Sequence, residues 1–384
     1  MLSSIFDIEF NPNKHLVHWD RINALVQGKD TSPVTLELDI CSICNHGCEW
    51  CVDPPRVHSN QLMPVPIAKR IMEEAKELDV KGIVFKGGGE STLHPKFNEI
   101  IQIAGEMGFE IGVVTHGGNL NNQKLLNALV KYCAYIRISI DGPNPELRKD
   151  IHKVNDFYPM IEGIKKLINF KQSKRHPIVG ATFCIDHSRR FLIEKCIQIG
   201  EKICLDYVLI RPPFCEEVGF PAPYTSEEGA ILRNEIRMVA ENYCGKMQVM
   251  VGNWIGDKEL ENLSLKKKES NLARRDLSVQ KFEYNGIEHI TKRCLASPLF
   301  IVVTAEGEVY GCCCLRGIKE FSFGKVNYSS GISLTSIMKS ERRKQSLGKM
   351  QRVECLKYCT HPLNKINELI EYLSLPEKHH SSFI

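Results

Sequence analysis

The stretch that decides the fold runs from Val34 to Cys51 and reads VTLELDICSICNHGCEWC. Its first seven residues, 34–40, alternate apolar and polar side chains, which predicts a β-strand. Cys44, Cys48 and Cys51 follow with C-x3-C-x2-C spacing, so the loop at the end of this strand carries three thiols close together. Thiols at this spacing predict a metal centre held by a single loop.

Two kinds of metal centre are compatible with this loop. A 4Fe-4S cluster normally takes four thiolates, so a loop that supplies three leaves one iron open to a ligand that is not protein. Structural zinc is the alternative, because Cys41 would bring the segment to four thiols. Zinc-binding pairs are usually separated by about a dozen residues or more, and no second pair follows nearby, which favours the cluster.

The spacing, with Trp50 before the last cysteine, resembles the cluster loop of the radical S-adenosylmethionine (SAM) superfamily. The resemblance implies that Cys44, Cys48 and Cys51 hold a 4Fe-4S cluster whose open iron binds the amino and carboxylate groups of SAM. It also implies that an electron from the cluster cleaves SAM to a 5′-deoxyadenosyl radical. Trp50 is expected either to cover the adenine or to pack in the core.

A glycine triplet ends the next apolar run. Residues 81–86 read as a strand, and Gly87, Gly88 and Gly89 lead into Glu90. Three glycines indicate close backbone approach or angles that a Cβ would forbid, and a tight turn to a helix is the alternative. The segment resembles the Gly-Gly-Glu motif of the superfamily, which implies that Gly88, Gly89 and Glu90 hold the ammonium of SAM.

Strand and helix patterns then alternate along the chain. Further strands are predicted at 110–115, 135–140, 178–184 and 207–210, and helices at 65–78, 95–107, 122–130, 157–170 and 189–203. This alternation predicts an α/β fold with a parallel sheet. Resemblance to the superfamily narrows it to a partial (β/α)6 barrel.

More candidate ligands of SAM lie at predicted strand ends, where parallel sheets bind ligands. Ser139 and Asp141 share one strand face and resemble the motif that meets the carboxylate or ribose of SAM; a strand-ending Asp-Gly turn is the alternative. Thr115 and Asn119 are expected to reach SAM. His116 between them is expected to be a hydrogen-bonded wall residue.

Two residues near the sixth strand end are candidates for substrate chemistry. Arg211 would hold a carboxylate, phosphate or hydroxyl, and a structural salt bridge is the alternative. Cys215 is the spare thiol best placed to return a hydrogen atom to a substrate radical, and a buried inert thiol is the alternative.

A second group of cysteines lies near the C-terminus. Residues 299–314 read as a β-hairpin that ends in three cysteines, and an amphipathic helix is predicted around residues 334–347. The spacing resembles the auxiliary-cluster domains called SPASM and, in shortened form, Twitch. The resemblance implies a second 4Fe-4S cluster with the ligands Cys294, Cys312, Cys355 and Cys359.

The choice within the cysteine triplet depends on the resemblance. Strand parity puts Cys314 on the same face as Cys312, so only the family spacing favours Cys312. A zinc ribbon-like site remains the alternative for this group.

Length and composition set further bounds. A chain of 384 residues exceeds one ordinary core. We expect an N-terminal extension at 1–32, the barrel at 33–215, a connecting or lid segment at 216–290 with a helix at 226–243 and a strand at 248–251, and the auxiliary domain at 291–384.

The net charge of +4 makes nucleic acid an improbable partner. The sequence shows no membrane-spanning run or signal-peptide core, so a cytoplasmic location is expected, where sixteen cysteines are not a disulfide framework.

These features predict a radical SAM enzyme, a dehydrogenase or epimerase, that acts on a small polar metabolite such as an aminosugar or nucleoside. A flavodoxin or ferredoxin reductase is the expected electron donor. Peptide modification, by crosslinking or epimerisation, is the close alternative. A non-catalytic iron–sulfur or zinc sensor or scaffold is another, although it would not need the motifs at Gly88–Glu90 and Ser139–Asp141.

Overall fold

A computed structural model of the chain describes residues 14–51, 59–171, 176–211, 214–215, 220–221, 226–251, 280–284, 287–291, 294–352, 355 and 364–374. Ten strands of these residues form one sheet in the order β14-β13-β12-β1-β2-β3-β4-β5-β6-β9. The short elements outside this sheet and its main helices are η1 (Lys14–His18), η3 (Ser91–Leu93), η4 (His187–Leu192), η5 (Ser297–Leu299), η7 (Lys319–Phe321), η8 (Tyr328–Ser330), β7 (Phe214–Cys215), β8 (Phe220–Pro221), β10 (Gln280–Tyr284) and β11 (Ile287–Thr291).

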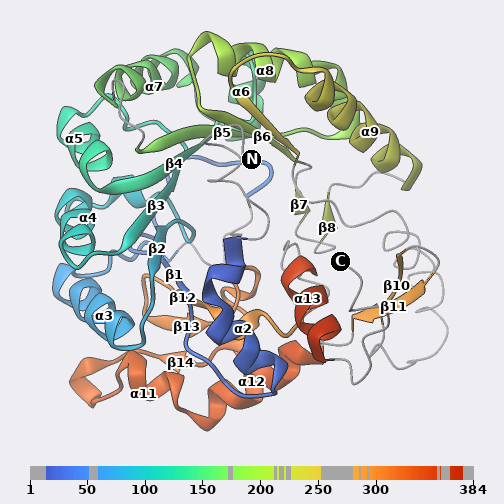
Figure 1. Ribbon diagram of the computed structural model, residues 1–384. Helices are drawn as coiled ribbons and strands as arrows, with labels where there is room; N and C mark the ends of the chain where they lie inside the picture. Colours follow the sequence, from blue (N-terminus) through green and yellow to red (C-terminus); the bar gives the residue numbers. More distant parts are fainter. Residues whose placement is uncertain are drawn as a thin grey trace.

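Consecutive parallel strands form the curved centre of the sheet. They are β1 (Thr35–Leu38), β2 (Gly82–Phe85), β3 (Glu110–Thr115), β4 (Cys133–Ser139), β5 (Ile178–Cys184) and β6 (Tyr207–Arg211). The helices between them are α3 (Val65–Glu77), α4 (Phe97–Glu106), α5 (Gln123–Tyr132), α6 (Pro145–His152), α7 (Phe157–Lys171) and α8 (Ile193–Lys202). Figure 1 shows α3, α4, α5, α7 and α8 outside the curve of the strands. The predicted partial (β/α)6 barrel is confirmed.

Side-chain alternation defines the two faces of this sheet. Ile136 and Ile138 of β4 are fully buried in the core against the outer helices. Tyr135, Arg137 and Ser139 alternate with them and are only partly buried. We call the side of the sheet away from the helices the inner face, and successive residues of a strand point to opposite faces. Tyr135, Arg137 and Ser139 therefore lie on the inner face.

Both edges of the barrel are extended by strands that lie far away in the sequence. On one edge, β9 (Gln248–Val251) pairs parallel with β6, after helix α9 (Ser226–Asn242). On the other edge, β12 (Phe300–Val303) pairs parallel with β1, and β13 (Glu308–Tyr310) and β14 (Gly324–Lys325) follow antiparallel. The C-terminal strands therefore continue the barrel sheet.

Helices from opposite ends of the chain pack together beside this edge. Helix α2 (Trp19–Val26) contacts α13 (Asn364–Ser374), and Figure 1 shows the two helices side by side. Their shared core is Ile22, Leu25, Ala296, Leu299 and Ile370. Burial of such side chains stabilises by about 1.5–3 kcal/mol each, so the N-terminal and C-terminal parts stabilise each other.

Two sequence predictions for the C-terminal part are wrong in detail. The hairpin strand ends at Tyr310, and Cys312 caps the 3-10 helix η6 (Cys313–Leu315), so strand parity does not relate Cys312 to Cys314. The single helix predicted around residues 334–347 is two helices, α11 (Leu334–Met338) and α12 (Glu341–Gln351). The break occurs because the Ser340 hydroxyl accepts the Arg343 amide and starts a new helix.

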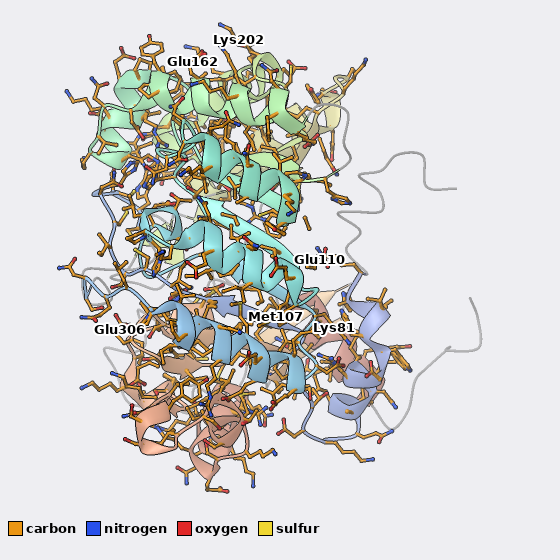
Figure 2. All side chains as sticks on the ribbon, turned by 90° about the vertical axis from the view of Figure 1, so that its left-hand side faces the viewer. Lys81, Met107, Glu110, Glu162, Lys202 and Glu306 are labelled. Carbon is orange, nitrogen blue, oxygen red and sulfur yellow. The ribbon has the colours of Figure 1, made fainter. Side chains whose placement is uncertain are left out.

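The carboxyl ends of the strands lie at one side of the molecule. Figure 2 shows Lys81 and Glu110, at the starts of β2 and β3, on the opposite side from Glu306, which follows β12. In the described part of the chain, no helix has the length and apolar composition needed to span a bilayer.

Candidate active site

The three thiols of the first cysteine motif follow β1. Cys44, Cys48 and Cys51 are partly exposed, whereas Cys41 is fully buried in the core. Burial raises the pKa of the Cys48 thiol, and nearby negative charges, Cys51 first, raise it further. Such a loop holds three thiolates only beside a cation, so these residues fit an iron–sulfur cluster.

The spread of the loop thiols distinguishes a cluster from a single zinc ion. Tetrahedral zinc with sulfur ligands at about 2.3 Å places those sulfurs about 3.8 Å apart. Among the residues that the structure describes, no group of three ligand atoms within 4.8 Å of one another contains more than one loop thiol. The loop is therefore more open than one zinc ion requires, as a larger four-iron cluster permits.

The glycine triplet packs against the cluster loop. Gly87 and Gly88 have φ values of 86° and 67°, which glycine adopts without a Cβ penalty. A Cβ on Gly89 would come within 2.4 Å of the Ile43 carbonyl oxygen. The Glu90 amide donates to that same oxygen at 2.8 Å. The backbone immediately before the first cluster cysteine is therefore held by the end of β2.

The Glu90 carboxylate is buried and joins the ends of β2 and β3. Its Oε1 accepts hydrogen bonds from the Thr92 and Thr115 hydroxyls at 2.6 and 2.7 Å. Its Oε2 accepts one from the His116 amide at 2.9 Å. The Asn119 side chain donates to the Thr92 carbonyl oxygen at 3.1 Å. Glu90, Thr115 and Asn119, predicted from two separate segments, thus belong to one hydrogen-bonded group.

Asp141 follows β4 in a left-handed conformation with a φ of 56°. Its Oδ1 accepts a hydrogen bond from the Cys184 amide at 2.9 Å, and its Oδ2 lies 3.1 Å from His152 Nε2. Burial opposes ionisation, but the His152 contact and the Arg211 charge hold the pKa of Asp141 below its usual value. Asp141 is therefore a carboxylate at neutral pH, beside the strand end that carries Ser139.

Three histidines lie beside the cluster loop. The rings of His46 and His116 stack with centroids 3.7 Å apart, and His152 Nδ1 lies 3.2 Å from His46 Nδ1 and 3.3 Å from the Cys48 sulfur. Burial lowers the pKa of His46 to about 3 and lowers that of His116, so both rings are neutral at neutral pH. His116 was predicted as a wall residue; His46 and His152 were not singled out from the sequence.

Arg148 anchors this histidine group. Its fully buried guanidinium donates to both Asp156 carboxylate oxygens at 2.9 and 3.0 Å. It also donates to the carbonyl oxygens of Ser139 and His116 at 2.6 and 2.9 Å. These charge-assisted bonds fix α6 against the ends of β3 and β4, which places His152 next to the cluster loop.

A buried ion-pair group connects β1 and β2 with the C-terminal part. Arg316, after η6, pairs with Glu37 of β1, and its Nε lies 2.8 Å from Asp39 Oδ2. Lys86 Nζ lies 2.9 Å from Glu37 Oε2. A Cβ on Gly87 would come within 2.2 Å of the Arg316 guanidinium. Burial lowers the pKa of Arg316 to about 9, so the guanidinium remains charged at neutral pH and holds both carboxylates.

Three more residues were predicted to lie near SAM or the substrate, and they come from three separate segments. Trp50 is partly exposed, and the Arg189 guanidinium lies 4.8 Å from its ring centroid. Arg211 ends β6 and pairs in register with Cys184, whose amide binds Asp141. Cys215 lies in β7, and its side chain is outside the described part of the chain.

The predicted ligands of an auxiliary cluster are Cys294, Cys312, Cys355 and Cys359. Cys294 is partly exposed and Cys355 is buried, while Cys359 lies outside the described residues. The Cys312, Cys313 and Cys314 sulfurs lie within 4.8 Å of one another. Hydrogen bonds from Cys313 and Cys314, with burial, raise the pKa of Cys312. The structure therefore offers three adjacent thiols where one ligand was predicted.

The cysteine loop after β1 and the strand ends around it lie in a segment that matches a known family. Residues 38–182, which run from the last residue of β1 into β5, match the radical SAM superfamily. This segment belongs to the radical SAM superfamily. The matched segment contains the cysteine loop, the glycine triplet and Asp141, and the family uses a 4Fe-4S cluster and SAM.

The curated relatives match only part of the chain. It is 32% identical over 91 residues to a tungsten-containing aldehyde ferredoxin oxidoreductase cofactor-modifying protein of Pyrococcus furiosus, covering 23% of this chain and 26% of that one. It is 28% identical over 144 residues to an S-adenosylmethionine-dependent nucleotide dehydratase of Flammeovirga pacifica, covering 36% and 49%. It is 22% identical over 142 residues to the mycofactocin maturase MftC of Mycobacterium ulcerans, covering 35% and 37%. The chain thus spans about half the length of these relatives or less.

Solved structures share the fold over more of the chain. SuiB of Streptococcus suis, bound to the precursor peptide SuiA, has a TM-score of 0.62 at 14% identity, covering 94% of this chain and 77% of that one. The anSMEcpe structure with bound AdoMet has a TM-score of 0.57 at 13% identity, covering 87% and 85%. The likeness at these identities is one of fold.

Proposed function

We propose that this radical SAM enzyme removes a hydrogen atom from a small polar metabolite, such as an aminosugar or a nucleoside. When bound, the 4Fe-4S cluster and SAM supply the chemistry for abstracting an unactivated hydrogen. The observation that carries the proposal is the inner face of the sheet, where polar and charged side chains replace the apolar core of an ordinary barrel. They include Glu37, Lys86, Tyr135, Arg137, Ser139, Thr182 and Arg211.

The chain's own residues position the reactants. Cys44, Cys48 and Cys51 would hold the cluster, and the backbone at Gly88 and Gly89 would receive the methionine part of SAM. Glu90 holds this backbone through its bonds to the next strand end. Orienting the two reactants in one site is a major part of what a protein contributes to such a reaction.

The nucleotide dehydratase relative supports a small polar substrate, because its name gives a nucleotide as the compound it acts on. A peptide substrate is the second candidate. It is supported by the mycofactocin maturase relative and by the likeness of fold to SuiB, which was solved with its precursor peptide. The mass of the modified compound separates the two candidates.

The auxiliary cluster favours dehydrogenation over epimerisation. A dehydrogenation removes one hydrogen atom and then a proton and an electron, and a second cluster held by Cys294, Cys312, Cys355 and Cys359 would accept that electron. A flavodoxin or ferredoxin would supply the electron that starts each cycle. Epimerisation instead needs a hydrogen donor, and Cys215 would be that donor. A product made in deuterated water loses two mass units in the first case and gains one deuterium in the second.

The proposed function is tested by anaerobic reconstitution with iron, sulfide and SAM, followed by reduction. We expect formation of 5′-deoxyadenosine, measured by liquid chromatography and mass spectrometry. Extracts of cells with and without the chain are then compared to find the compound that changes. The variant with Cys44, Cys48 and Cys51 all replaced by Ala is the control. Stoichiometric zinc and no iron after strictly anaerobic isolation would overturn the proposal.

A further inference from the structure

Arg137 occupies an unusual position on the inner face. It lies on β4, two residues before Ser139, and points away from the helices because Ile136 and Ile138 fill the outer core. It is partly exposed. Its Nε donates to the Tyr207 hydroxyl at 3.2 Å, and its Cζ lies 5.8 Å from the Tyr135 ring centroid.

Two glycines make room for these tyrosines. Gly112 of β3 pairs in register with Tyr135, and Gly180 of β5 pairs with Tyr207. A Cβ on Gly112 would come within 2.3 Å of the Tyr135 ring, and a Cβ on Gly180 within 2.2 Å of the Tyr207 ring. Both rings therefore lie across a neighbouring strand, one on each side of Arg137.

The buried arginine and lysine side chains in the described residues each have a carboxylate partner. The pairs are Arg21 with Asp79, Arg148 with Asp156, Lys171 with Asp206, Arg316 with Asp39 and Arg343 with Asp30. Lys86, which follows β2, also pairs with a carboxylate, that of Glu37. In the described part of the chain, the Arg137 guanidinium has a hydrogen bond to the Tyr207 hydroxyl and a cation–π contact with Tyr135, and it forms no ion pair with a carboxylate.

We propose that Arg137, together with Tyr135 and Tyr207, binds an anionic group of the substrate, a carboxylate or a phosphate. This inference rests on the proposed function and specifies the class of its substrate. A guanidinium on the inner face of a barrel is less hydrated than a surface arginine, and an oxyanion can replace the lost water contacts with two parallel hydrogen bonds.

The tyrosines suit this role as hydrogen-bond donors. Burial raises the pKa of Tyr135, so its hydroxyl keeps its proton at neutral pH. Arg137 lies two residues from Ser139 along the strand, which corresponds to about 7 Å. The anionic group would therefore be held about 7 Å deeper in the barrel than the expected SAM contact, leaving the rest of the substrate to reach toward SAM.

The test measures anion binding, not turnover. Reconstituted protein with SAM is titrated with inorganic phosphate and separately with acetate, at constant ionic strength, in an isothermal calorimeter. We expect saturable binding of at least one anion, weakened at least about tenfold in Arg137→Gln. Tyr207→Phe should weaken binding by about threefold or more, because one hydroxyl is lost. Binding of phosphate alone indicates a phosphate ester, and binding of acetate alone indicates a carboxylate.

Two further variants keep the result interpretable. Arg237→Gln removes an exposed arginine from α9 and should bind the anions as the unchanged protein does. If Arg137→Gln does not fold, Arg137→Lys keeps the charge without the planar fork and should bind about threefold more weakly or worse. Equal binding by the unchanged protein and the Arg137 variants, or no binding by the unchanged protein, would overturn the inference. Formation of 5′-deoxyadenosine by the same samples tests the proposed function separately.

Discussion

Cys41 and Cys44 lie on the same short segment, yet their surroundings differ. Cys41 is fully buried, and its thiol donates to the Ile43 carbonyl oxygen at 3.5 Å; Cys44 is partly exposed in the loop. We expect Cys41→Ala to keep the cluster and reductive SAM cleavage, because only a small core contact is lost. Iron content and 5′-deoxyadenosine formation measure the two properties.

Cys44→Ala is the matched control for this prediction, and it should lose both the first cluster and SAM cleavage. Loss of the cluster in Cys41→Ala, at unchanged folding, would show that Cys41 is a fourth ligand. No iron would then be open to SAM.

Glu90 is expected to act through the strand ends that it joins. In Glu90→Gln, an amide nitrogen replaces an oxygen that now accepts hydrogen bonds, so one donor is left facing another. The free energy of unfolding should fall by about 2 kcal/mol, and SAM should bind more weakly. Urea unfolding and equilibrium dialysis with SAM measure these effects. Glu73→Gln on the exposed side of α3 is the control, and equal behaviour of the two variants would contradict the role of Glu90.

For single residues, the sequence predicts a role where the residues that act together are close in the chain. The spacing of Cys44, Cys48 and Cys51 is local, so the loop could be predicted. The contacts of Arg148 and Arg316 reach residues on other strands, and nothing in their neighbouring sequence marks them. The inward position of Arg137 follows from strand parity, but its phenol partner Tyr207, and the lack of a carboxylate partner among the described residues, appear only when β4, β5 and β6 are in register.

Among the elements, the turn after β2 is closely fitted against the C-terminal part of the chain. Gly87→Ala adds a Cβ at positive φ, and that Cβ collides with the Arg316 guanidinium. Gly28→Ala adds one at a φ of 70° with nothing within 4 Å. We expect Gly28→Ala to lose about 1 kcal/mol of stability and Gly87→Ala to lose about 3 kcal/mol more, because a buried ion pair is broken. Denaturant unfolding measures both.

Equal losses in these two glycine variants would show that Arg316 moves aside without cost. The triplet would then not depend on the C-terminal part. A larger loss in Gly87→Ala, removed when Arg316 is also replaced by Ala, would locate the cost in that contact.

Periodic patterns predicted the elements of the barrel. Apolar residues recur every two residues in its strands and every three to four residues in the helices that pack on them. The C-terminal part was predicted less well. Cys312–Cys314 continue the strand pattern in sequence, but the chain turns into η6, and no periodicity signals such a 3-10 turn. The Ser340 cap could have been recognised, since Ser before Glu341 is a common helix start.

For the whole molecule, the pairing of strands from distant parts of the sequence decides how the C-terminal part joins the barrel. The strand β12 lies in register with β1 over its full length, although more than half the chain separates them in sequence. A pairing between such distant strands leaves no local signal, so the sequence suggested separate parts where the structure has a continuous sheet. The carboxylates of Glu37 and Asp39 reach Arg316 across this same junction.

Removing the C-terminal part should therefore unfold the barrel, not merely remove a cluster. A chain that ends at residue 290 exposes the edge of β1 and the apolar face of α2, because β12 and α13 cover them. We expect it to be insoluble or to unfold without cooperativity, measured by circular dichroism during heating. The variant with Cys312, Cys313 and Cys314 all replaced by Ala is the control. It keeps the sheet, and it should hold about four irons where the unchanged protein holds about eight. A truncated chain that folds, binds about four irons and cleaves SAM would show that the barrel is stable without its extended edge.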